Sequence, residues 1–145
     1  MNIVICSSID FTMKIIEAYE FLLKKGHHVE IPHYSKKIIN GDILMEDYLK
    51  IKEKHGDIEL RKSSGQNLIK RHFDLINKSD AILVINIDKK GIKNYIGGNT
   101  FLEMGFAHVL GKKIFVYNDL PTMAYSDELK EMNTIVINRI FKKIK

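Results

Sequence analysis

A single carboxylate stands out in the chain, because Glu103 is the only acidic residue of the apolar segment 94–108. Apolar neighbours would keep this carboxylate poorly hydrated and reactive, and such carboxylates can attack the anomeric carbon of a sugar. The same residue completes the pattern S/T-x-x-E with Thr100. That pattern predicts a capping box, in which both side chains bond the first turn of a helix. The residues alone leave both interpretations open.

Small and polar residues lie where they could assist such a carboxylate. Gly97 and Gly98 would let a backbone or a ligand approach closely. Asn99 and the free amides of a helix start could bind hydroxyl or phosphate oxygens. Near the N-terminus, Ser7 and Ser8 follow an apolar run and can donate hydrogen bonds. These residues are candidates for substrate binding.

The remaining reactive side chains predict neither a metal site nor a cofactor. Cys6 ends an apolar run and is interpreted as a core thiol. The six histidines are scattered, and none has the spacing of H-E-x-x-H or C-x-x-C ligands. A single cysteine cannot form an internal disulfide, which favours a reducing, cytoplasmic setting.

Short β-branched runs alternate with helical patterns along the chain. Strands are predicted at residues 3–6, 29–32, 81–87, 114–117 and 134–137. Helices are predicted at residues 12–25, 43–54, 64–78 (capped by Ser63 or Ser64), 99–110 and 127–132. The run at 81–87 is apolar on both faces, as in a central parallel strand. The alternation predicts a flavodoxin-like or Rossmann-like doubly wound α/β fold: a five-stranded parallel sheet, order 2-1-3-4-5, in a three-layer α/β/α arrangement.

The predicted fold also locates a ligand crevice. Ligands of doubly wound sheets bind beyond the carboxyl ends of the strands, where the strand order reverses. This rule selects the loops at residues 7–11, 88–100 and 118–126. Glu103, in the first turn of the helix that follows the second of these loops, would lie at the same edge.

Composition favours one compact domain, residues 1–145, with 45% hydrophobic residues. An irregular insertion is predicted at about 33–62, and disorder is predicted for the lysine-rich tail 139–145. The net charge of +5 comes mainly from scattered lysines, which indicates a solvated surface more than a nucleic-acid interface. No apolar run approaches the roughly 20 residues that span a bilayer, so no membrane partner is predicted.

Three blocks of the sequence resemble the nucleoside 2-deoxyribosyltransferase superfamily, which includes the 2′-deoxynucleoside 5′-phosphate N-hydrolases. They occur in the order Ile5-Cys6-Ser7-Ser8-Ile9, Asp74-Leu75-Ile76-Asn77-Lys78-Ser79-Asp80-Ala81, and Thr100-Phe101-Leu102-Glu103-Met104-Gly105-Phe106-Ala107, the last followed by Gly111-Lys112-Lys113. The third block is the most specific of the three. The resemblance implies cleavage of the N-glycosidic bond of 2′-deoxyribonucleosides or their 5′-monophosphates, with transfer of the sugar to water or to a second base.

The resemblance also assigns roles to residues. It makes Glu103 the nucleophile that forms a covalent deoxyribosyl-enzyme intermediate, and it makes Asp74 the group that binds and protonates the base. Asp74 could instead be an exposed helical residue paired with Lys70 or Lys78. The substrate-binding set that we predict is Ser7, Ser8, Ile9, Asp88, Gly97, Gly98, Asn99 and Thr100. The superfamily builds its site across a dimer, which implies a homodimer or higher homo-oligomer that shares the loop Asn118 to Ser126, with Met123 and Tyr125 available to cover a base. The same two residues could instead cover the edge of the core.

Two departures from the superfamily pattern bear on activity. Gly97 stands six residues before Glu103, where the superfamily usually has aspartate or serine, so that contact is missing or is supplied by Asp88, Lys93, Asn94 or Asn99. The first loop lacks the glycines and arginine expected around a 5′-phosphate, and Asp10 would repel a phosphate if it pointed inward. These departures motivate an alternative hypothesis, a non-catalytic nucleotide-binding or signalling module on the same fold.

Overall fold

The computed structural model describes residues 1–63, 65 and 67–145, and of residues 57–61 and 63 the backbone alone. Five strands form one sheet: β1 Asn2–Ser7, β2 His28–Glu30, β3 Ala81–Ile85, β4 Lys113–Val116 and β5 Ile135–Val136. Their order is β2-β1-β3-β4-β5 and every neighbouring pair is parallel. The predicted doubly wound fold and its strand order are therefore confirmed.

Alternation of side chains along the strands builds two cores. In β1, Ile3 and Ile5 face one side of the sheet while Val4 and Cys6 face the other, because successive residues of a strand point to opposite faces. All five residues of β3 are buried, as the apolar run at this position predicted. The sheet is thus covered on both faces, as a parallel sheet requires.

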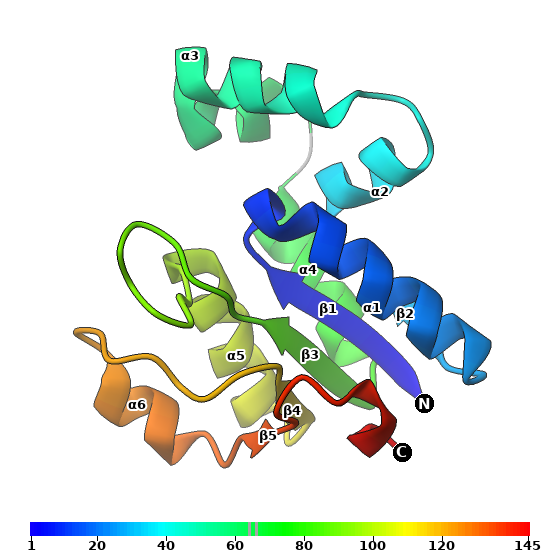
Figure 1. The fold of residues 1–145 in the computed structure, drawn as a ribbon, viewed down its shortest axis with the longest axis vertical. Coiled ribbons are helices and arrows are strands. Elements are labelled where there is room, and N and C mark those ends of the chain that lie inside the picture. The colour runs from blue at the N-terminus through cyan, green and yellow to red at the C-terminus, as the bar shows by residue number, and fades with distance from the viewer. Residues whose placement is uncertain (64, 66) are drawn as a thin grey trace.

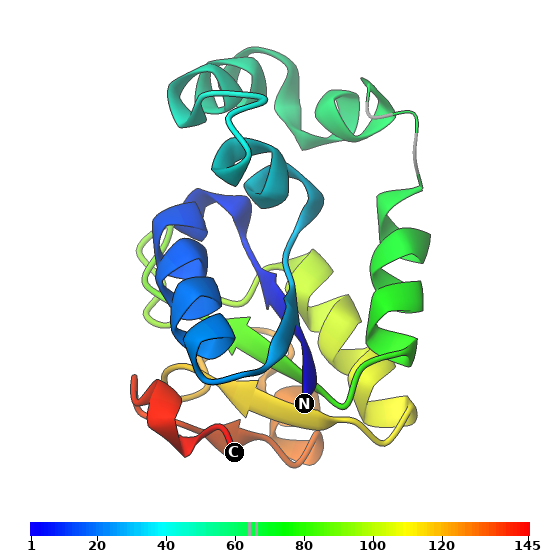
Figure 2. The same cartoon turned by 90° about the vertical axis from the view of Figure 1, so that its right-hand side faces the viewer.

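Helices form the two outer layers (Figures 1 and 2). The helices are α1 Thr12–Lys24, α2 His33–Ile39, α3 Met45–Ser63, α4 Leu68–Asn77, α5 Gly98–Val109 and α6 Ser126–Glu131, with short 3-10 turns η1 Ile9–Phe11 and η2 Phe141–Lys143. Helix α1 and η2 cover one face of the sheet, and α4, α5 and α6 cover the other. No helix among the described residues is long and apolar enough to cross a membrane.

The segment 33–62, where an irregular insertion containing a helix at 43–54 was predicted, is mostly helical, and the predicted helix corresponds to the first part of α3. It forms α2 and α3, which lie beyond the carboxyl end of β1 (Figure 1). Gly56 breaks α3 with φ 73° and ψ 170°, a conformation that glycine adopts without strain. Tyr34 and Tyr48 hold the two helices together through ring contact at 5.4 Å. The segment therefore forms a roof over one edge of the sheet.

One other local prediction is corrected by the structure. Helix α4 begins at Leu68, and its N-cap is Asn67, whose side-chain oxygen accepts from the amide of Lys70 at 3.0 Å. Ser63 belongs to α3, and Ser64 lies outside the described residues. In the tail, Phe141 and Ile144 are buried in the core beside α1, whereas disorder of the tail in solution stays a prediction.

Candidate active site

A cavity of about 320 Å³ lies at the predicted crevice, beyond the carboxyl ends of β1 and β3. Its wall comes from the loop after β1, the loop after β3, and helices α2, α3, α4 and α5. Most of the predicted site residues line it, namely Ser7, Ser8, Ile9, Gly97, Gly98, Asn99, Thr100 and Glu103. The sheet-edge rule thus located the cavity from sequence, although the roof from α2 and α3 was not foreseen.

Glu103 does not cap its helix. Helix α5 begins at Gly98 and has Gly97 as its N-cap, without a side-chain hydrogen bond at the cap. Glu103 is therefore the sixth residue of the helix, more than a full turn inside it, and Thr100 is a buried residue of the first turn. The capping-box interpretation is wrong because the glycines let the helix start earlier, and the carboxylate faces the cavity instead.

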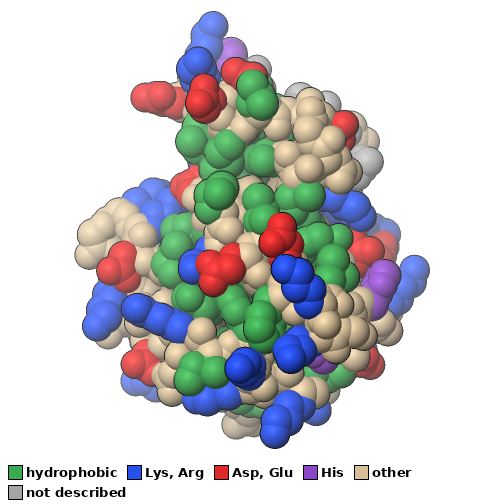
Figure 3. All heavy atoms as spheres, turned by 45° about the vertical axis from the view of Figure 1, so that its right-hand side comes forward, with side chains coloured by type: hydrophobic (Ala, Val, Ile, Leu, Met, Phe, Trp, Pro, Cys, Tyr) green, Lys and Arg blue, Asp and Glu red, His purple; other side chains and the backbone are tan. Residues whose placement is uncertain are grey.

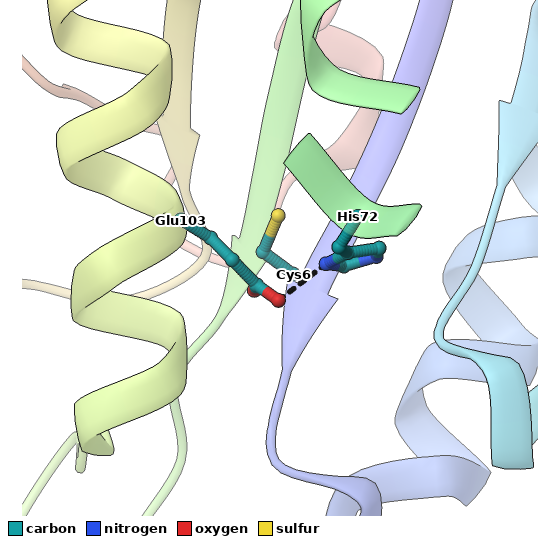
Figure 4. A group of neighbouring side chains, drawn as sticks. All are labelled: Cys6, His72 and Glu103. Carbon is teal, nitrogen blue, oxygen red and sulfur yellow. Dashed lines mark hydrogen bonds and ion pairs between the residues drawn. The ribbon is translucent and has the colours of Figure 1, made fainter. Parts of the chain in front are cut away.

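The partner of Glu103 is His72 of α4, which the sequence analysis did not select. Nδ1 of His72 lies in hydrogen-bond contact with Oε1 of Glu103 (Figure 4). The two side chains are only 7% and 16% exposed, so the pair is largely withdrawn from solvent. The second ring nitrogen of His72, Nε2, is buried and has no partner among the described atoms. His72 therefore orients the carboxylate through Nδ1, while Nε2 is not committed to another described atom.

Cys6 completes this group from the end of β1 (Figure 4). Its thiol is fully buried, in agreement with the core role predicted for it. Burial raises the pKa of Cys6 well above its usual value, and the negative charge of Glu103 raises it further. Cys6 is therefore a protonated thiol beside the glutamate and a poor nucleophile.

Asp74 does not reach the cavity. Its side chain is 48% exposed and its carboxylate accepts from Nζ of Lys70 at 3.2 Å, the exposed i,i+4 pairing given as the alternative. Two residues along a helix are separated by about 200°, so His72 and Asp74 project to opposite sides of α4. A signal for His72 was present in the sequence, because it lies four residues from both Leu68 and Ile76 on the apolar stripe.

Asp88 is also outside the cavity and has a structural role. Its carboxylate accepts from the backbone amide of Asn94 at 2.8 Å and so closes the loop after β3. Nearby, the buried Asn86 exchanges hydrogen bonds with Asn118, whose amide donates to Asn86 at 2.9 Å. These contacts fix the loops after β3 and β4 to each other at the edge of the sheet.

Asp10 lines the cavity, but two lysines neutralise it. Nζ of Lys52 lies 2.9 Å from one carboxylate oxygen and Nζ of Lys89 lies 2.6 Å from the other. Burial raises the pKa of Asp10, but hydrogen bonds from these lysines outweigh that effect and hold the pKa below its ordinary value. Lys89 also donates to Oγ of Ser8 at 2.9 Å. The repulsion predicted between Asp10 and an anion is thus offset, since two cations accompany one acid.

The space that a side chain at position 97 would use is taken by Tyr95. A Cβ on Gly97 would lie 3.2 Å from a ring carbon of Tyr95 and 3.4 Å from its hydroxyl oxygen. Tyr95 lines the cavity, and Nζ of Lys89 lies 5.5 Å from the centre of its ring. A glycine at 97 is therefore what lets the tyrosine hydroxyl approach the start of α5.

The loop from Asn118 to Ser126 packs on its own chain. Tyr125 stacks on Phe101 of α5 with ring centroids 4.3 Å apart, and its hydroxyl donates to the carbonyl of Ile96. Tyr125 thus covers an edge of the core, which was one of its two predicted roles. Contribution of this loop to a partner's site stays a prediction.

Charged side chains are mixed on the face shown in Figure 3. Among the described residues drawn there, lysines and arginines are interspersed with acidic, hydrophobic and other side chains, without a continuous basic stripe. A nucleic-acid surface would gather such cations along one track. Four basic side chains line the cavity, namely Lys52, Arg71, Lys89 and Lys90.

Fold and site together define a doubly wound α/β protein with a buried glutamate–histidine pair in its switch-point cavity. No family model and no curated protein matches the chain. Among solved structures, the chain is similar to the CMP N-glycosidase BcmB from Clostridium botulinum, with 16% identity, a TM-score of 0.50, and coverage of 98% of this chain and 97% of that one. A flavoenzyme NAD(P)H:(acceptor) oxidoreductase, FerB from Paracoccus denitrificans, has 14% identity, a TM-score of 0.46, and coverage of 95% and 76%. The likeness to BcmB confirms the fold that the sequence resemblance implied.

Proposed function

We propose that this protein cleaves the N-glycosidic bond of 2′-deoxyribonucleosides or their 5′-monophosphates, with Glu103 as the nucleophile. The observation that carries the proposal is the position of the Glu103 carboxylate, which faces a 320 Å³ cavity and contacts His72 instead of the helix start. A cavity of this volume is in the range of small-molecule sites. A carboxylate with one fixed partner and little solvent suits attack on a carbon centre.

The reaction runs as a double displacement. An oxygen of Glu103 attacks C1′ of the sugar while the bond from C1′ to the base nitrogen breaks and its electrons pass to the base. The base leaves with a proton, and the sugar stays on the glutamate as an ester. Water or a second base then attacks C1′ and releases the carboxylate, so the configuration at C1′ is retained.

His72 takes the part that the resemblance gave to Asp74. Its contact with Oε1 fixes the orientation of the Glu103 carboxylate before attack. It is also a proton source beside the nucleophile, since a histidine can give a proton to the departing base and take one from the incoming water. Asp74 cannot do this because it lies on the outer side of α4.

Polar groups around the cavity would hold the sugar or phosphate. A Cβ on Gly97 would lie 3.4 Å from the hydroxyl oxygen of Tyr95, so we assign to this hydroxyl the contact that a polar side chain at position 97 would make and Gly97 cannot. Ser8, held by Lys89, and Asn99 at the start of α5 face the same cavity. The neighbouring cations favour a 5′-phosphate over an uncharged sugar. Similarity to a CMP N-glycosidase supports nucleotide glycoside cleavage in general.

The test is a panel of nucleosides and nucleoside monophosphates, deoxyribo and ribo, incubated with the protein with and without an acceptor base. Chromatography of released base and exchanged product separates hydrolysis from transfer. We expect Glu103→Gln to abolish base release, by analogy with other nucleophile replacements that cost several orders of magnitude. Asp74→Asn is the matched control, an acid of the same region outside the cavity, and should leave the rate unchanged.

Two outcomes would reject the proposal. Base release that survives Glu103→Gln removes the glutamate from the mechanism. If the unaltered protein releases no base from any member of the panel but binds nucleotides, the non-catalytic alternative is correct. Mass spectrometry of the protein quenched during turnover adds a direct check, because the ester on Glu103 increases the mass by one deoxyribosyl or deoxyribosyl-phosphate group.

A further inference from the structure

The side chains of Cys6, His72 and Glu103 form a cluster of three different metal-ligand types (Figure 4). They come from β1, α4 and α5, elements that are distant in sequence. One sulfur, one ring nitrogen and one carboxylate oxygen lie within 4.8 Å of one another. Thiolate, imidazole and carboxylate are the ligands of protein-bound zinc.

We infer that this cluster binds one Zn²⁺ ion. Zinc bonds of about 2.0–2.3 Å in tetrahedral geometry hold the ligand atoms roughly 3.5 Å apart, so side-chain adjustments of about an ångström would bring the three atoms to bonding positions. Three protein ligands leave a fourth position, as in catalytic zinc sites. That position faces the cavity, since Glu103 and His72 both line it and give the ion a route inward.

Charge and proton balance favour the ion. One thiolate and one carboxylate offset the two positive charges, so the buried site is neutral when zinc is bound. The proton of the Cys6 thiol leaves to solvent. Nδ1 of His72 binds through its lone pair while the ring proton resides on Nε2, the nitrogen that has no partner among the described atoms.

Zinc binding would have a consequence for the proposed reaction. The metal would bind the carboxylate that attacks C1′ and withdraw its electrons, so zinc would inhibit base release and a chelator would restore it. This consequence rests on the proposed function, whereas the binding itself does not. The site has no signature in the sequence, because its ligands are 66 and 31 residues apart.

Equilibrium dialysis of the untagged protein against Zn²⁺, followed by metal analysis, tests the site. We expect one zinc per chain. Cys6→Ser and His72→Ala should each weaken binding by at least roughly tenfold, because even outer-shell changes at zinc sites cost that much. His28→Ala is the control, since His28 is 71% exposed and lies outside the cluster. Zinc binding that is absent, or equal in all variants, would overturn the inference.

A second measurement guards against a variant that fails to fold. Co²⁺ placed in the unaltered protein should give the absorption of a thiolate-to-cobalt transition, and addition of Zn²⁺ should remove it. Cobalt that binds without this absorption would show that Cys6 is not a ligand and would also overturn the site. Both readouts are independent of base release, so a protein that binds zinc but still releases no base after a chelator has removed the metal rejects only the proposed function.

Discussion

The pairing of His72 with Glu103 predicts a large energetic coupling that can be measured without a substrate. The perturbations are His72→Ala, Glu103→Ala and the double variant. Both side chains are largely buried, at 7% and 16% exposure, so each single change leaves one polar group without its partner where water is scarce. A hydrogen bond to a charged group contributes about 1.5–3 kcal/mol, and this is the expected coupling.

The chain supplies a matched control on the same helix. Lys70 and Asp74 form an i,i+4 pair with side chains 69% and 48% exposed, for which about 0.3–0.5 kcal/mol is expected. Urea unfolding of each set of four proteins gives the coupling as the departure from additivity. A coupling of 2 kcal/mol also corresponds to roughly 4–8 °C in Tm for a chain of this size.

The result that would refute the pairing is a coupling between His72 and Glu103 no larger than that of the exposed pair. The two single variants need not both be destabilised, since an active-site carboxylate can cost stability and its removal can be favourable. The coupling remains informative in that case, because it isolates the interaction from the burial cost of each group. An unchanged slope of unfolding against urea is the control for two-state behaviour.

Two further predictions concern the cavity. The pKa of Asp10 is lowered, so its pairing with Lys52 and Lys89 stabilises the fold fully above the ordinary pKa near 3.8, and this stability is lost as the pH falls through the lower folded value. The destabilisation caused by Asp10→Asn, measured by urea unfolding, should therefore become smaller as the pH is lowered. A destabilisation that stays constant or grows would contradict the ion pairs. Tyr95→Phe should lower kcat/KM for base release by about twofold to tenfold, which is the effect of losing one uncharged hydrogen bond, and should leave Tm unchanged. An unaltered kcat/KM would show that Tyr95 does not bind the substrate.

The sheet could be predicted from the sequence because strands buried on both faces need apolar residues at successive positions. All five residues of β3 are apolar and buried, as a central parallel strand with helices on both faces requires. The helix predicted at 43–54 forms the part of α3 before Gly56, but helix α2 and the position of both helices over the cavity could not be predicted from the sequence pattern. The packing of the tail was also not predicted, because two buried apolar residues, Phe141 and Ile144, lie among lysines that dominate its composition.

The site shows where periodicity and motif give different answers. Motif resemblance selected Asp74, whereas the period of the helix selects His72, because a histidine four residues from Leu68 and Ile76 must lie on the buried face. The capping box failed in the same way: the pattern was present, but the glycines before it moved the helix start and turned Glu103 into the cavity. In both cases the position of the residue along its helix determined whether its side chain faces the cavity. The catalytic role that we propose for Glu103 therefore depends on a second element, α4, which presents an imidazole to its carboxylate, and that contact is the property which His72→Ala and its cycle with Glu103→Ala will measure.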